Sequence, residues 1–200
     1  MRNKALLLVD IQNDFCPGGA LEVASGDEVV SVANRIAKHF DLVIATQDWH
    51  PPDHGSFASN HAGGKPGEVI ELDGLDQVLW PDHCVQESSG AELREDLDLG
   101  PVKKVFKKGT DPTIDSYSAF YDNGHRKSTG LSDYLKQCDV QDVYIMGLAT
   151  DYCVKETVLD GLRLDFDVTV LADGIRAVGL EPGDGARAIA EMVGAGARVR

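Results

Sequence analysis

The chain has 200 residues, of which 19 are basic and 33 acidic, so its formal net charge is −14. This length suits one α/β domain, and we expect a single domain over residues 1–200. The strong negative charge argues against nucleic-acid binding and against an anionic membrane surface as a partner, but it is compatible with a small neutral substrate. No apolar run approaches the ~20 residues needed to cross a bilayer, and the four cysteines show no paired spacing. We therefore expect a cytoplasmic protein with free thiols.

Short apolar runs alternate with helical patterns along the chain. The runs predict strands at 5–9, 42–46, 104–107, 143–146 and 168–172 and near Arg198. The helical patterns lie at 27–40, 91–97, 129–137, 154–162 and 184–193. This alternation predicts a three-layer αβα sandwich around a six-stranded parallel sheet. The stretches 48–87 and 109–127 lack strong periodicity, and loops of that length in a compact domain are usually functional.

Chemically active side chains follow several of the predicted strands. Asp10, Asp48, Lys108 and Cys153 each stand at or just after a strand's carboxyl end, where open α/β sheets gather their chemistry. Taken singly, Asp10 could cap a turn, Lys108 could be a solvated charge and Cys153 a small buried side chain. A carboxylate, a lysine and a thiol at one edge are hard to explain by packing. Their combination favours an active site over separate structural roles for these residues.

The motifs around these residues resemble the isochorismatase-like cysteine hydrolases, and among them the nicotinamidases, also called pyrazinamidases. The Asp10, Lys108 and Cys153 set is typical of the superfamily. An Asp-x-His motif at Asp48 and His50 with a later Trp-Pro-x-His is typical of the nicotinamidases. The matching stretches cover most of the chain: 8–21, 46–51, 56–57, 80–85, 107–109, 115–120 and 147–154.

The resemblance implies a covalent mechanism for an amide substrate. Cys153 would attack the carboxamide carbon and form a thioester, with Asp10 as the base and Lys108 holding the pair by charge. The backbone N–H groups of Ala149 and Cys153 would bind the oxyanion. Family members have a cis peptide bond at the position of Leu148–Ala149.

The resemblance also implies a metal site and an aromatic pocket. Asp48, His50 and His83 would hold one divalent metal ion, with zinc expected first and iron or manganese accepting the same ligands. His54 is a less secure ligand, because histidines in loops are more often solvated. The pocket for a flat ring would be lined by Phe15, Leu21, Trp80, Tyr117 and Ala149.

These features predict a metal-dependent amidohydrolase that converts nicotinamide to nicotinate and ammonia in NAD salvage and also accepts pyrazinamide. One alternative is another amide or carbamoyl hydrolase of the superfamily, which the two histidines argue against. Another is a non-catalytic metal- or ligand-binding protein on the same fold, which would need no thiol nucleophile. The sequence leaves the oligomeric state open, a homo-oligomer included.

Overall fold

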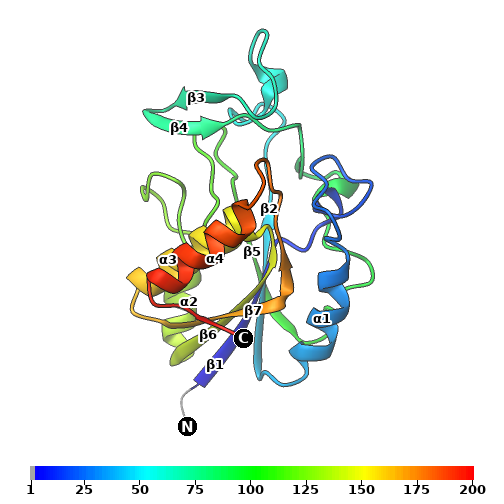
Figure 1. The fold of residues 1–200 in the computed structure, drawn as a ribbon. Coiled ribbons are helices and arrows are strands. Elements are labelled where there is room, and N and C mark those ends of the chain that lie inside the picture. The colour runs from blue at the N-terminus through cyan, green and yellow to red at the C-terminus, as the bar shows by residue number, and fades with distance from the viewer. Residues whose placement is uncertain (1–2) are drawn as a thin grey trace.

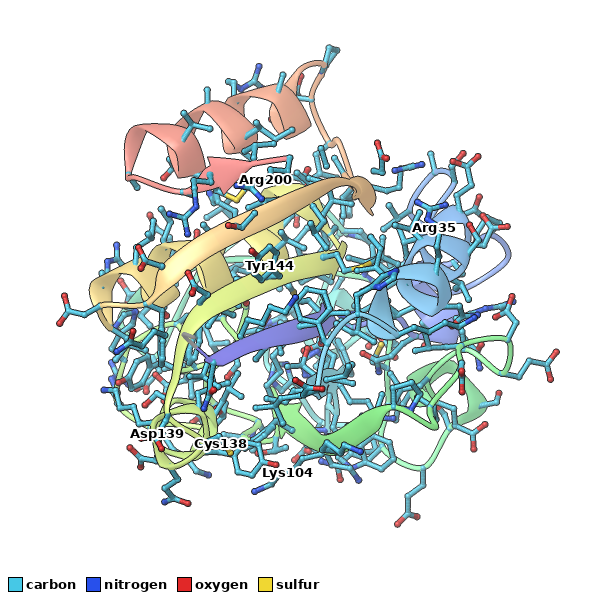
Figure 2. The ribbon with its side chains drawn as sticks, turned by 90° about the horizontal axis from the view of Figure 1, so that it is seen from below. Arg35, Lys104, Cys138, Asp139, Tyr144 and Arg200 are labelled. Carbon is cyan, nitrogen blue, oxygen red and sulfur yellow. The ribbon has the colours of Figure 1, made fainter. Side chains whose placement is uncertain are left out.

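The computed structural model describes residues 3–200 and is built around a parallel sheet of six strands. The strands lie in the order β5-β2-β1-β6-β7-β8, which can be followed from below in Figure 2. Each predicted apolar run falls within one of them, so the six-stranded prediction is confirmed. Their bounds are Asn3–Val9 (β1), Leu42–Asp48 (β2), Val102–Lys108 (β5), Val140–Leu148 (β6), Asp167–Arg176 (β7) and Arg198–Val199 (β8).

Helices cover both faces of this sheet (Figure 1). One face carries α2 (Leu131–Gln137), α3 (Lys155–Arg163) and α4 (Asp184–Gly194), and the other carries α1 (Glu28–Ala37). The central strands are apolar on both sides, because both faces of the sheet are covered. The three-layer prediction is therefore confirmed. Within residues 3–200, no helix combines the length and apolar character that a membrane span requires.

The prediction of a helix at 91–97 is wrong. Only Ala91 of this segment belongs to a 3-10 turn (Ser89–Ala91); the rest forms an isolated bridge between Leu93 and Gln12 and then a turn in which Leu97 N–H donates to Arg94 O. Its backbone bonds instead to the segment after β1: Asn13 N–H donates to Glu92 O, and Arg94 N–H donates to Ile11 O. Hydrogen bonds to a distant segment thus outweigh a weak local helical pattern.

The long stretch 48–87 contains a β-hairpin that the sequence analysis missed. Strands β3 (Val69–Leu72) and β4 (Leu75–Val78) pair antiparallel and project above the carboxyl edge of the sheet (Figure 1). The turn between them, Asp73-Gly74, has φ values of 50° and 79°. An Asp-Gly pair between alternating apolar residues is a strong hairpin signal, so the sequence did contain the information.

Gly147 allows β6 to approach β1 closely at the carboxyl edge. It pairs with Val9, its φ is 125°, and a Cβ atom built there would overlap the Val9 carbonyl oxygen. A side chain would therefore force apart the two strands that lead to Asp10 and Cys153.

Gly147→Ala should lower the free energy of unfolding by roughly 2–4 kcal/mol, because it combines a steric overlap with a strained φ. Chemical denaturation of both proteins measures the difference. Gly194→Ala is the matched control, since Gly194 is helical with nothing within 4 Å of its added Cβ. Equal stability of the two variants would contradict this account of Gly147.

Candidate active site

The order of the strands brings four predicted site residues to one edge. Asp48 and Lys108 end the adjacent strands β2 and β5, and Asp10 directly follows β1. Cys153 lies in a π-helical turn, Thr150–Val154, between β6 and α3. Because β1 and β6 are neighbours from which the chain continues in opposite directions, this edge is the switch point where α/β sheets bind ligands.

Lys108 connects the nucleophile to the carboxylates. Its buried Nζ donates to Cys153 Sγ at 3.4 Å, to Asp48 Oδ1 at 2.5 Å and to the Ser116 carbonyl oxygen at 2.8 Å. Asp10 Oδ2 lies 2.9 Å from the same nitrogen. These carboxylates raise the pKa of Lys108 well above its usual range although burial opposes the charge. Lys108 is therefore a fixed cation between Asp10, Asp48 and the thiol.

Asp10 is a buried carboxylate with one oxygen free of hydrogen bonds. Oδ1 accepts from the Thr46 hydroxyl at 2.6 Å, whereas Oδ2 has the ionic contact with Lys108 but no hydrogen-bond partner. Ligand atoms of Asp10, Asp48 and Cys153 lie within 4.8 Å of one another. Burial raises the pKa of Asp10 to about 6, although Lys108 opposes the rise. Such a carboxylate can accept a proton near neutral pH.

The Cys153 thiol is also buried. Burial raises its pKa well above the usual range, and the charge of Lys108 offsets only part of this effect. The direction of this shift favours the protonated thiol in the free site. A neighbouring base is required to take that proton, and the nearby Asp10 has an oxygen, Oδ2, that accepts no hydrogen bond.

Asp48, His50 and His83 form a donor set that fits a divalent metal ion. His50 Nδ1 lies 2.8 Å from Gly109 O, and His83 Nδ1 lies 2.7 Å from Pro81 O. A carbonyl oxygen can only accept, so each Nδ1 carries the hydrogen and each Nε2 keeps a lone pair. The two Nε2 atoms lie 3.5 and 3.9 Å from Asp48 Oδ2, and His50 Nε2 is buried without a hydrogen-bond partner.

The charges around this set also suit a cation. Lys108 and His50 hold the pKa of Asp48 well below its usual range despite burial, so it stays ionised. Burial, with a smaller effect from the neighbouring His50 ring, lowers the pKa of His83 to about 4, so the His83 ring is neutral, as a ligand must be. A Cβ at Gly109 would overlap the His50 ring, so glycine is needed beside this histidine.

His54 lies beside the set but groups with different neighbours. Its ring lies 4.2 Å from that of His50, and its ligand atoms group with those of His50 and Asp115 rather than with Asp48. Its Nδ1 lies 2.7 Å from the Ser56 hydroxyl oxygen, and its Nε2 is buried without a hydrogen-bond partner. The grouping of His83 with Asp48 and His50 favours His83 over His54 as the second imidazole ligand.

One cavity opens onto both clusters. Its empty space, with the solvent at its mouth included, is about 330 Å³. All of the predicted wall residues line it, together with Asp48, His83 and Cys153. The lining also includes three residues that the sequence analysis did not assign: Asp115, Tyr152 and Val178. Asp115 stands in a motif quoted above and Tyr152 precedes the cysteine, so both could have been found, whereas Val178 required the end of β7 to be placed.

The backbone near the nucleophile has the expected form. The Leu148–Ala149 peptide bond is cis, and Ala149 and Cys153 both line the cavity. Their N–H groups as oxyanion donors stay a prediction.

Comparison with known proteins agrees with this arrangement. Residues 4–200 match the isochorismatase domain family. This chain belongs to the isochorismatase family. Within that family, the nicotinamidase of Escherichia coli strain K12 is 54% identical over 201 residues, covering 98% of this chain and 94% of the relative. The resemblance found in the sequence is thereby confirmed.

Solved structures of the isochorismatase family also superimpose closely. A nicotinamidase/pyrazinamidase from Acinetobacter baumanii has a TM-score of 0.96 at 43% identity, covering 100% of this chain and 96% of that chain. The pyrazinamidase of Pyrococcus horikoshii in complex with zinc has a TM-score of 0.78 at 36% identity, covering 99% of this chain and 98% of that chain.

Proposed function

We propose that this chain is an amidohydrolase that converts nicotinamide to nicotinate and ammonia and so contributes to NAD salvage. The observation that carries the proposal is that a Lys108-centred nucleophile cluster and an Asp48, His50 and His83 donor set open onto one aromatic-walled cavity. The sequence relationship to proteins named nicotinamidase supports the same substrate.

In the proposed reaction, Asp10 Oδ2 takes the thiol proton as Cys153 Sγ attacks the carboxamide carbon. The backbone N–H groups of Ala149 and Cys153 stabilise the resulting oxyanion. Asp10 then gives the proton to the departing nitrogen, and ammonia leaves a thioester on Cys153. Water, deprotonated by Asp10, attacks this thioester, and the released sulfur recovers the proton. Lys108 keeps the carboxylate and the sulfur together throughout.

The other end of the cavity would select the substrate. Asp48, His50 and His83 would hold a divalent metal, most simply zinc, and a bound metal supplies a Lewis acid for the pyridine nitrogen. Phe15, Leu21, Trp80 and Tyr117 would provide apolar walls for the ring.

The purified protein should release ammonia from nicotinamide and from pyrazinamide, which also has a ring nitrogen meta to the carboxamide. Benzamide lacks that nitrogen, so its kcat/KM should be lower by at least about 100-fold, equivalent to roughly 2.7 kcal/mol. A coupled ammonia assay on metal-loaded protein measures all three. Failure to release ammonia from nicotinamide would refute the proposal, and release from a carbamoyl compound instead would support the alternative hydrolase.

A further inference from the structure

Gln77 is a buried polar residue outside the six-stranded sheet and outside both reactive clusters. It lies on β4 of the hairpin above the carboxyl edge, and its side chain is only 3% exposed. The hairpin is attached to the loops around the site, because Asp73 pairs with Arg126 and a Cβ at Gly55 would lie 2.7 Å from Leu72 Cδ1. A side chain on this hairpin can therefore be held in a defined place relative to the pocket.

The Gln77 amide nitrogen contacts three acceptors. It shares its two N–H groups among Val78 O at 2.8 Å, Tyr117 Oη at 3.0 Å and Asp115 Oδ2 at 3.2 Å. Two of these acceptors are a carbonyl and a carboxylate oxygen, which would repel an amide oxygen in the same position. The orientation of the amide is therefore fixed by its neighbours. Both Asp115 and Tyr117 line the cavity.

Tyr117 Oη also accepts the Trp80 indole N–H at 3.1 Å. The two N–H donors from Gln77 and Trp80 thus fix the position of one phenol oxygen. The ring of Tyr152, beside the nucleophile, packs edge-on against both aromatic residues, with centroids 4.8 Å from Trp80 and 5.4 Å from Tyr117. Trp80, Tyr117 and Tyr152, which we call the aromatic wall, are therefore linked to the hairpin through one amide.

We propose that Gln77 is a positioning residue that orients the aromatic wall and thereby sets how tightly the pocket holds the ring of its amide substrate. The inference rests on the proposed function for the identity of that substrate. Within residues 3–200, the Gln77 amide nitrogen donates to Val78, Tyr117 and Asp115 and not to the nucleophile cluster, so Gln77 should affect ring binding more than bond cleavage.

Gln77→Leu keeps the approximate size of the side chain but removes the donor. We expect KM for nicotinamide and Kd for nicotinate to rise about tenfold, equivalent to about 1.4 kcal/mol, with kcat changed less than about threefold. Steady-state kinetics and isothermal titration calorimetry on metal-loaded protein measure these values. Glu71→Ala, an exposed position on the same hairpin, is the matched control and should leave them unchanged.

A double-mutant cycle with Tyr117→Phe tests the route of the effect. Both changes break the same hydrogen bond, so their effects should not add. The Kd of the double variant for nicotinate should be at most about twice that of the single variant with the higher Kd. If Gln77 only anchored the hairpin, the two substitutions would cause additive losses of nicotinate binding free energy, and that result would overturn the proposal. If circular dichroism shows that Gln77→Leu does not fold, the nearly isosteric Gln77→Glu replaces it. A carboxylate also cannot donate a hydrogen bond to Asp115.

The inference can fail independently of the proposed function. Unchanged KM and Kd in a folded Gln77 variant of an active enzyme would reject the inference alone. Absence of ammonia release by the wild-type protein would reject the proposed function alone. In that case the indole N–H resonances of the two tryptophans in an NMR spectrum provide the test. Gln77→Leu should shift the Trp80 resonance and leave the Trp49 resonance in place. An unchanged Trp80 resonance would reject the inference.

Discussion

Cys153→Ala should abolish the release of ammonia from nicotinamide, with kcat reduced by at least about 10⁴-fold. The proposed reaction passes through a bond to Sγ, and no other thiol lines the cavity among the described residues. The change removes one atom from a buried side chain and leaves the aromatic wall in place, so nicotinate should still bind within about threefold of the wild-type Kd.

Ammonia detection at high enzyme concentration and calorimetry with nicotinate separate the two effects. Cys138→Ala is the matched control, because Cys138 caps α2 away from the carboxyl edge and is half-buried. Turnover by Cys153→Ala above about 1% of wild type would remove Cys153 as the nucleophile. Loss of nicotinate binding together with activity would show that the variant had damaged the pocket.

His83→Ala should weaken metal binding by well over tenfold, so that the purified variant holds much less than the wild-type content of metal. The ring offers an Nε2 lone pair 3.9 Å from Asp48 Oδ2, and its Nδ1–H is already donated to Pro81 O. Elemental analysis after dialysis measures the metal directly, without reference to activity. Nicotinamide hydrolysis should fall in parallel.

His39→Ala, an exposed position on the turn after α1, is the control for loss of a histidine and should keep the metal content of the wild type. His54→Ala distinguishes the two candidate imidazoles, because His54 groups with His50 and Asp115 whereas His83 groups with Asp48 and His50. Full metal content in His83→Ala, or its loss only in His54→Ala, would reverse the assignment.

The two reactive clusters share one carboxylate. Asp48 Oδ1 accepts from Lys108, whose Nζ also contacts the thiol, while Asp48 Oδ2 faces His50 and His83. A change at Asp48 therefore affects both the charge near the nucleophile and the candidate metal ligands. For this reason a substitution of His83 tests metal binding more directly than a substitution of Asp48.

Much of the fold could be predicted because the strands are buried on both faces and so appear as continuous apolar runs. The 91–97 helix could not be rejected locally, because its competitor is hydrogen bonding with residues 11–13, about 80 positions away. The hairpin at 69–78 was missed although Asp73-Gly74 indicates it. Gln77 was missed with it, since a lone glutamine has no distinctive sequence signal.

The sequence by itself determined which groups carry the chemistry: a cysteine, an aspartate and a lysine after three strands, and an Asp-x-His motif with a later histidine. Strand ends can be read locally because apolar runs stop there. Only the tertiary structure decided how these groups act on one another. Burial raises the pKa values of Asp10 and Cys153 above their usual values. The carbonyl groups of Gly109 and Pro81, brought against the rings by the folded loops, set the tautomers of His50 and His83. Desolvation and hydrogen-bond direction depend on which segments surround a side chain, and that is a property of the folded chain.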